Sequence, residues 1–124
     1  MKLNTVKNIG RSDFVNMGPI ELRQPIPTQE IEMVDPFILL HHSEPRYIQP
    51  GGPGFDVAPH PHRGFEPVTF VFQGEVEHRD SRGNHGIVGA GGVQWITAGM
   101  GIIHSEGSPK SFMNTGGNLE LIQL

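Results

Sequence analysis

The chain has 124 residues, a length typical of one domain. Its formal net charge is −4 and it has no cluster of lysine or arginine, which argues against a surface for nucleic acids or anionic membranes. It contains no cysteine, which excludes disulfides, thiolate nucleophiles and cysteine-based metal sites and fits a reducing cytoplasm. No apolar stretch approaches the roughly 18 residues of a membrane span, so we expect a cytoplasmic protein that does not enter the membrane.

The first half of the chain consists of short apolar segments separated by proline and glycine. Residues 3–9 suggest a short strand, and residues 20–24 alternate as a second strand. Prolines flank this second strand, and because proline cannot donate to a sheet, we expect the strand at a sheet edge. Residues 37–42 form an apolar run short enough for a buried strand, and the glycines and prolines of residues 49–54 predict a loop.

The second half of the chain alternates strand-like and turn-like segments. Residues 67–72 are β-branched and aromatic, residues 75–80 alternate with period two, and Gly74 between them predicts a hairpin. Further strands are expected at residues 85–88, 93–97 and 118–124, with a polar loop at residues 108–117. No window of ten residues keeps a helical period without glycine or proline. About eight short strands separated by turns predict an all-β sandwich or barrel.

Two short motifs each place metal-capable side chains two residues apart. His60 and His62 form the first pair, and His104 and Glu106 form the second. In extended backbone residues i and i+2 point to one side of a sheet, so both pairs can face one interior. Three imidazoles and one carboxylate suit iron, manganese, nickel, copper or zinc, and a six-coordinate metal would keep two positions open. Open positions indicate chemistry rather than a purely structural site.

A plainer alternative exists for these pairs, because two polar residues separated by one also occur on solvated strand faces. The small residues Gly99 and Gly101 before His104 favour a site, since they let backbone pass close to one. Pro61 removes one ladder hydrogen bond, which puts the first pair on an edge strand or at a bulge. Bulges often re-aim side chains beside sites, so Pro61 is compatible with metal binding.

Glu66 is a further candidate, because it lies four residues after His62 and shares its face if the strand continues. It could be a fifth ligand, a general base or a partner of the neighbouring arginine. We favour a partner that orients a ligating histidine, whose loss typically costs about 10–100-fold in affinity or activity. His78 is interpreted as a surface or hydrogen-bonded strand histidine, His85 as solvated and Trp95 as part of the core.

The chain resembles the pirins, a branch of the cupin superfamily. The resemblance covers residues 35–124 and rests on the motifs HPHRGFE (60–66), GEVEHRDSRGN (74–84) and GVQWITAGMGIIHSE (92–106). It implies a cupin-type jelly-roll β-barrel. In the family the N-terminal barrel holds one iron through two histidines of the first motif and a histidine and a glutamate of the last. These ligands correspond here to His60, His62, His104 and Glu106.

The resemblance implies one of two functions. Bacterial members have quercetin 2,3-dioxygenase activity, which would make a flavonol the substrate and Fe(II) the cofactor, with Mn, Ni, Cu or Zn as other metals that suit the donors. Glu106 or Glu66 would then accept the substrate's proton. Eukaryotic members regulate partner proteins in a redox-sensitive way, which would make the chain a non-enzymatic metal-binding module. A scaffold that has lost its metal is a third alternative.

The sequence departs from the family pattern in three places. Pro67 stands where threonine is usual, and the loop that begins at Gly107 is less typical. Pirins also continue past the strand that resembles residues 119–124 into a second cupin domain. We therefore expect residues 1–124 to form the N-terminal cupin domain alone, as a natural short form or a truncated one. Because the second domain would cover part of the first barrel, we expect self-association through an unpaired edge.

Overall fold

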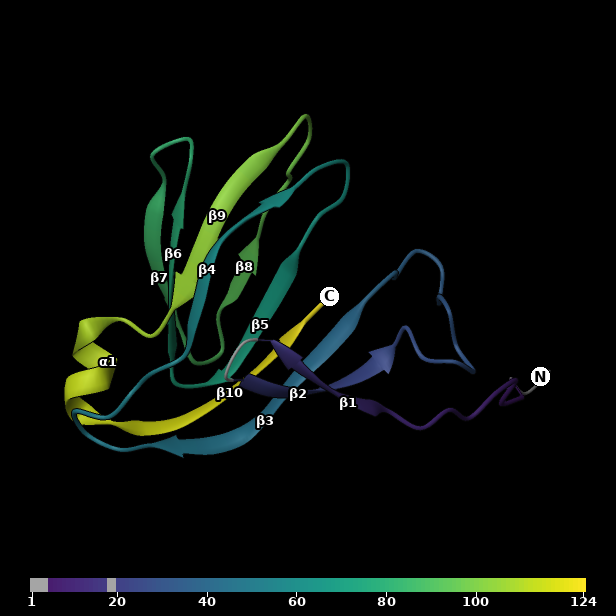
Figure 1. The fold of residues 1–124 in the computed structure, drawn as a ribbon, viewed down its shortest axis with the longest axis horizontal. Coiled ribbons are helices and arrows are strands. Elements are labelled where there is room, and N and C mark those ends of the chain that lie inside the picture. Colours follow the sequence, from purple (N-terminus) through teal and green to yellow (C-terminus); the bar gives the residue numbers. More distant parts are fainter. Residues whose placement is uncertain (1–4, 18–19) are drawn as a thin grey trace.

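The computed structural model describes residues 5–17 and 20–124, in which the chain forms ten strands and one short helix (Figure 1). All paired strands are antiparallel, so the expected all-β architecture is confirmed. In chain order the elements are β1 (Asp13–Met17), β2 (Ile20–Ile26), β3 (Leu40–Ile48), β4 (Asp56–His62), β5 (Val68–Gln73), β6 (Glu75–Asp80), β7 (His85–Gly89), β8 (Val93–Trp95), β9 (Ile102–Gly107), α1 (Lys110–Thr115) and β10 (Gly117–Gln123).

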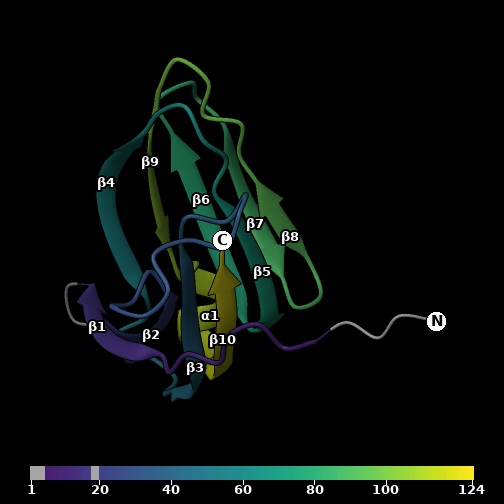
Figure 2. The ribbon, with the colours of Figure 1, turned by 90° about the vertical axis from the view of Figure 1, so that its right-hand side faces the viewer.

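The strands form two sheets around one interior. The larger sheet has the order β1-β2-β3-β10-β5-β8, and the smaller sheet has the order β4-β9-β6-β7. Figure 2 shows the strands of both sheets surrounding this interior. Alternate side chains point inward, as Leu119 and Leu121 do from β10 and Val76 does from β6. The period-two pattern of the sequence therefore translates directly into an inner and an outer face.

Apolar side chains from both sheets fill one part of the interior. The buried cluster contains Ile20, Leu22, Ile48, Phe55, Val71, Val76, Phe112, Leu119 and Leu121. Fully burying one such side chain contributes about 1.5–3 kcal/mol, so this cluster holds the two sheets together. Phe112 comes from α1, which lies at one end of the sheets (Figure 1) and forms where the sequence predicted a polar loop. At six residues α1, the one helix of the described residues, is far too short to cross a bilayer.

The expectation that the strand at residues 20–24 lies at an edge is wrong. The strand forms as β2, but it lies between β1 and β3. Pro25 is accommodated because the pairing with β3 shifts register between Arg23 and Ile26, and the pairing with β1 ends at Gln24. The missing N–H of Pro25 therefore costs no ladder hydrogen bond.

The hairpin expected around Gly74 is also wrong. β5 belongs to the larger sheet and β6 to the smaller one, so the chain changes sheets at this glycine. Gly74 has a φ of 83°, and a Cβ there would lie 2.8 Å from the carbonyl oxygen of Asn118. The position thus requires glycine for its conformation and for space. It marks a corner of the barrel rather than a two-stranded turn.

The N-terminal region also differs from expectation. No strand forms at residues 5–9, the described part of the expected strand at 3–9, and Val6 and Ile9 are 77% and 82% exposed. The strand expected at residues 37–42 starts at Leu40, because Phe37 and Ile38 lie exposed before it. These differences leave the interior of the barrel unchanged.

Pro61 lies on an edge strand, the first of the two places that the sequence predicted. β4 is the outer strand of the smaller sheet, and its pairing with β9 shifts register between Val57 and His60. This register shift determines which of the later residues of β4 point into the barrel. The His-Pro-His segment is therefore placed by an irregularity, next to the strand that carries the second motif.

Candidate metal centre

The two metal-capable motifs lie on neighbouring strands. In the pairing of β4 with β9, His60 is directly opposite His104, and Pro61 and His62 are opposite Ile103 and Ile102. Side chains two residues apart share a face, so His62 points to the same interior as His60. Glu106, two residues after His104 on β9, is buried on that face as well. The sequence prediction that both pairs face one interior is confirmed.

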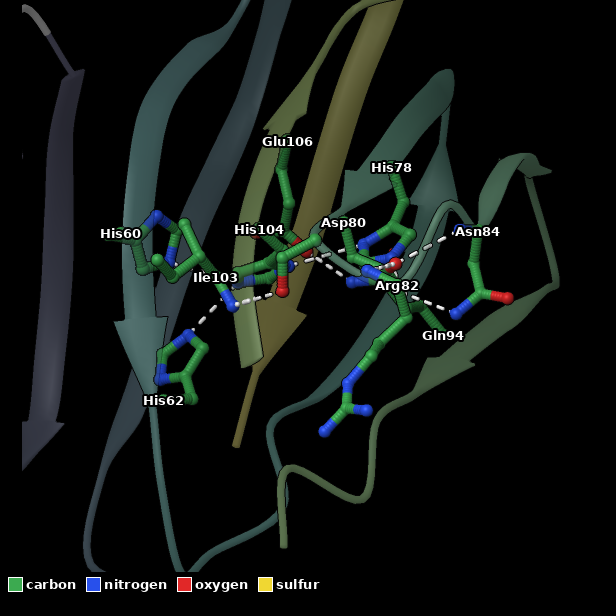
Figure 3. A network of polar contacts seen from close by, with 11 residues as sticks. His60, His62, His78, Asp80, Arg82, Asn84, Gln94, Ile103, His104 and Glu106 are labelled. Carbon is green, nitrogen blue, oxygen red and sulfur yellow. Dashed lines mark hydrogen bonds and ion pairs between the residues drawn. The ribbon is translucent and has the colours of Figure 1, made fainter. Parts of the chain in front are cut away.

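Three imidazoles converge at this position (Figure 3). The Nε2 atom of His104 lies 3.0 Å from Nε2 of His60 and 3.0 Å from Nε2 of His62. The candidate ligand atoms of the three residues all lie within 4.8 Å of one another. His104 is buried, whereas His60 and His62 are half-buried, so the group opens toward the surface on the β4 side.

The hydrogen bond made by Nδ1 of His60 shows which nitrogen of this ring carries the proton and which has a free lone pair. Nδ1 of His60 lies 2.9 Å from the carbonyl oxygen of Ala58. A carbonyl can only accept, so this Nδ1 carries the proton and Nε2 presents a lone pair to the group. Imidazole nitrogens with free lone pairs are ligands for iron, nickel, copper and zinc. The three residues therefore fit a mononuclear metal ion.

Burial keeps His104 and His62 in the form that a metal requires. Burial, with smaller effects from the neighbouring rings of His60, His62 and His78, lowers the pKa of His104 to about 4. Burial also lowers the pKa of His62, with a smaller effect from His60. A base with a lowered pKa stays neutral at pH 7, and only a neutral imidazole can bind a metal.

Glu106 is held by two amides in the barrel interior. Its carboxylate accepts hydrogen bonds from Nε2 of Gln94 and, at 3.3 Å, from Nε2 of Gln123. Burial raises the pKa of this carboxyl, whereas Gln94 opposes the shift. The carboxylate does not belong to the group formed by the three imidazoles. Its predicted roles as fourth ligand and proton acceptor stay predictions.

Glu66 lies beside the exposed side chain of Trp95. Its carboxylate accepts hydrogen bonds of 2.8 Å from Nε1 of Trp95 and 2.8 Å from Oγ1 of Thr97, and these bonds, Thr97 first, lower its pKa. Trp95 is 67% exposed, so the expectation that it belongs to the core is wrong. The catalytic or orienting role of Glu66 stays a prediction.

A fourth histidine, His78, touches the histidine group, although its sequence pattern did not predict a place beside it. His78 of β6 lies opposite Glu106 across the pairing with β9, and its Nδ1 is 3.2 Å from Nδ1 of His104. Of the two interpretations of His78, the hydrogen-bonded strand histidine is the one observed. The period-two alternation of Val76, His78 and Asp80 carried the signal that His78 faces the interior. His85, by contrast, is half-exposed and contacts Glu77.

Comparison with known proteins settles the family. Residues 19–124 match the family model described as Pirin. The chain belongs to the pirin family. It is 50% identical over 91 residues to a Pseudomonas aeruginosa protein whose name assigns it provisionally to the quercetin 2,3-dioxygenases, a match that covers 73% of this chain and 32% of that protein.

Solved structures of similar proteins show the same fold. A quercetin 2,3-dioxygenase from Acinetobacter baumannii matches with a TM-score of 0.76 and 36% identity, over 92% of this chain and 40% of that one. The Escherichia coli pirin YhhW in complex with nickel(II) matches with a TM-score of 0.64 and 31% identity, over 90% and 46% of the two chains. The expected cupin-type fold is confirmed. The chain spans about a third of the length of the curated relatives it matches.

Proposed function

We propose that this pirin domain is a metal-dependent oxidoreductase of the quercetin 2,3-dioxygenase type, with a flavonol as substrate. The observation that carries the proposal is the convergence of three imidazole Nε2 atoms, with His104 3.0 Å from each of the other two. The name of the Acinetobacter baumannii structure supplies the reaction class. Without that convergence the family likeness alone would not favour an enzyme.

His60, His62 and His104 would hold the metal, and Glu106 is proposed as its fourth ligand. Iron(II) is our first choice, and manganese, nickel, copper and zinc suit the same donors. A metal bound there would supply a Lewis acid that lowers the pKa of the substrate's hydroxyl. The relative with nickel(II) supports a divalent ion, and nickel is a convenient probe of the site.

Glu106 is also proposed to accept the proton of the flavonol hydroxyl. Burial raises the pKa of its carboxyl, which makes it a better proton acceptor than an ordinary glutamate. The amide of Gln94 would hold the carboxylate in place while it does so. Phe65, whose ring centroid lies 5.1 Å from that of His62, offers an apolar edge against which a flat aromatic substrate could pack.

One observation favours a second function, a metal-dependent regulatory module that binds a partner. A cavity of about 330 Å³ is lined by Phe55, Glu77, Glu106 and Met113, but the three histidines do not line it. The three histidines meet at a half-open surface instead, and an open metal site of this kind suits a protein contact.

Turnover after metal loading separates these two functions. The chain is reconstituted anaerobically with Fe(II), its metal content is measured, and oxygen uptake and carbon monoxide release are followed after quercetin is added. We expect oxygen uptake and carbon monoxide release in the wild type and in the surface variant His85→Gln, and neither in His104→Ala. Full metal occupancy without turnover would refute the enzyme and leave the regulatory module.

A further inference from the structure

A chain of hydrogen bonds leads from the metal centre into the turn after β6 (Figure 3). Nδ1 of His104 lies 3.2 Å from Nδ1 of His78, and Nε2 of His78 lies 3.1 Å from Oδ2 of Asp80. The His104 residue is 1% exposed, and the side chains of His78 and Asp80 are 12% and 3% exposed. These hydrogen bonds are therefore shielded from water, and the proton of each bond lies between two of the three side chains.

Asp80 ends this series of hydrogen bonds, and its carboxylate is held in place by several donors. Its Oδ1 accepts hydrogen bonds from the backbone N–H groups of Arg82 and Asn84, at 2.8 and 3.0 Å. Its Oδ2 accepts from Nδ2 of Asn84 at 2.8 Å and from His78. An ionised carboxylate can only accept, and three donors in addition to His78 hold Asp80 in that form. Nε2 of His78 must therefore carry a proton.

The proton on Nε2 of His78 determines where the protons of His104 lie. When His78 is in its neutral form, the proton on Nε2 leaves a lone pair on Nδ1, which accepts a hydrogen bond from Nδ1–H of His104. His104 then has no proton on Nε2, which is the atom 3.0 Å from Nε2 of both His60 and His62. The charge of Asp80 thus decides which nitrogen of His104 is free to bind a metal.

We propose that Asp80 and His78 are positioning residues that fix the tautomer and ring orientation of His104 for metal binding. The inference rests on the metal site of the proposed function and does not depend on the dioxygenase reaction. Metal-ligating histidines commonly donate their other N–H to a partner in this way, and loss of the partner typically weakens metal binding about 10–100-fold.

The turn that follows Asp80 is itself attached to β9 beside His104. The N–H of Ser81 donates to the carbonyl of Ile103 at 2.8 Å, and Oγ of Ser81 accepts from the N–H of Ile103 at 3.2 Å. In the strand pairing, Asp80 lies directly opposite His104. The turn therefore keeps the carboxylate at a constant distance from the ligand, as an orienting group requires.

The variant Asp80→Asn tests the inference with almost no change in shape. Two backbone N–H groups and the side chain of Asn84 compete for the one remaining oxygen, so the new amide NH₂ faces His78. His78 must then accept at Nε2 and donate from Nδ1, which moves the proton of His104 to Nε2. We expect nickel(II) to bind about 10–100-fold more weakly by calorimetry. In the metal-free protein, ¹⁵N–¹H spectra of the imidazoles should show the proton of His104 on Nδ1 in the wild type and on Nε2 in the variant.

Two further variants separate positioning from folding and from direct ligation. Asn84→Ala removes one contact to Asp80 but keeps the carboxylate, so it should bind nickel like the wild type; a loss as large as that of Asp80→Asn would overturn the inference. His78→Phe should weaken binding about 10–100-fold while one nickel still binds per chain. Complete loss of nickel in His78→Phe, as expected for a true ligand, would also overturn it.

The result for the wild type distinguishes this inference from the function on which it rests. If the wild type binds one nickel ion and Asp80→Asn binds it equally well with an unchanged tautomer, the positioning role is refuted and the metal site stands. If the wild type binds no nickel, the metal site is refuted, and the positioning role with it.

Discussion

Removing one imidazole should uncouple metal binding from thermal stability. His60→Ala deletes a half-buried side chain whose Nε2 lies 3.0 Å from Nε2 of His104. Outside the histidine group, the ring makes one hydrogen bond, to the backbone carbonyl of Ala58. The metal-free variant should therefore fold like the wild type, and its defect should appear only when metal is present.

The size of the effect follows from the number of ligands. A structural four-ligand zinc site is worth about 10–16 kcal/mol, so one ligand of four contributes about 3 kcal/mol, or roughly 150-fold in Kd. At a metal concentration about 1,000 times the wild-type Kd, binding stabilises the fold by about 4 kcal/mol, and in the variant by about 1 kcal/mol. A change of 1 kcal/mol corresponds to roughly 4 °C in a domain of this size. The metal-induced rise in Tm should fall from roughly 16 °C to roughly 5 °C.

Differential scanning calorimetry with and without nickel(II) measures this rise directly. His85→Ala is the matched control, because His85 is a half-exposed histidine outside the histidine group, and it should keep the full rise. An equal rise in His60→Ala and in the wild type would refute the assignment of His60 as a ligand. A fall in Tm of metal-free His60→Ala as large as the lost rise would show that the side chain acts in folding instead.

Four further outcomes are expected. Leu119→Ala, at a side chain with no exposed surface, should lower the free energy of unfolding by about 2–5 kcal/mol in urea, and a loss below about 1 kcal/mol would contradict its place in the core. Burial lowers the pKa of His41, so the unfolded chain binds a proton that the folded chain does not. Stability should then fall as pH drops below about 6.5, and less steeply in His41→Gln; parallel pH profiles would contradict this. Glu106→Gln should abolish quercetin turnover while Glu66→Gln retains it, and the reverse result would assign the proton acceptor to Glu66. Light scattering at high concentration should detect self-association through a sheet edge such as β8, and a strictly monomeric mass would count against it.

The sequence was sufficient for features that depend on local spacing. Period-two alternation located β6, and the spacing of His60 and His62 placed both on one face of β4. Pro61 correctly indicated an edge strand, because the lack of an N–H restricts where proline can lie. The same reasoning failed for Pro25, since a bulge in an interior strand accommodates proline equally well.

Features that depend on strand order could not be read from the sequence. His78 touches His104, and Asp80 touches His78, only because β6 lies beside β9 in a register that puts Asp80 opposite His104. Period-two alternation groups His78 and Asp80 on one face of a strand but cannot say which strand is their neighbour. The hairpin predicted at Gly74 was wrong for the same reason. A glycine between two strands has the same sequence pattern at a hairpin and at a corner between sheets.

His60, His62 and His104 of this pirin domain are proposed to bind one metal ion. X-ray absorption spectroscopy of the nickel-loaded wild type counts the imidazoles around the metal. We predict three imidazole ligands on a single nickel ion, from His60, His62 and His104, and the loss of one of them in His60→Ala. A nickel ion with one imidazole or none would contradict the account.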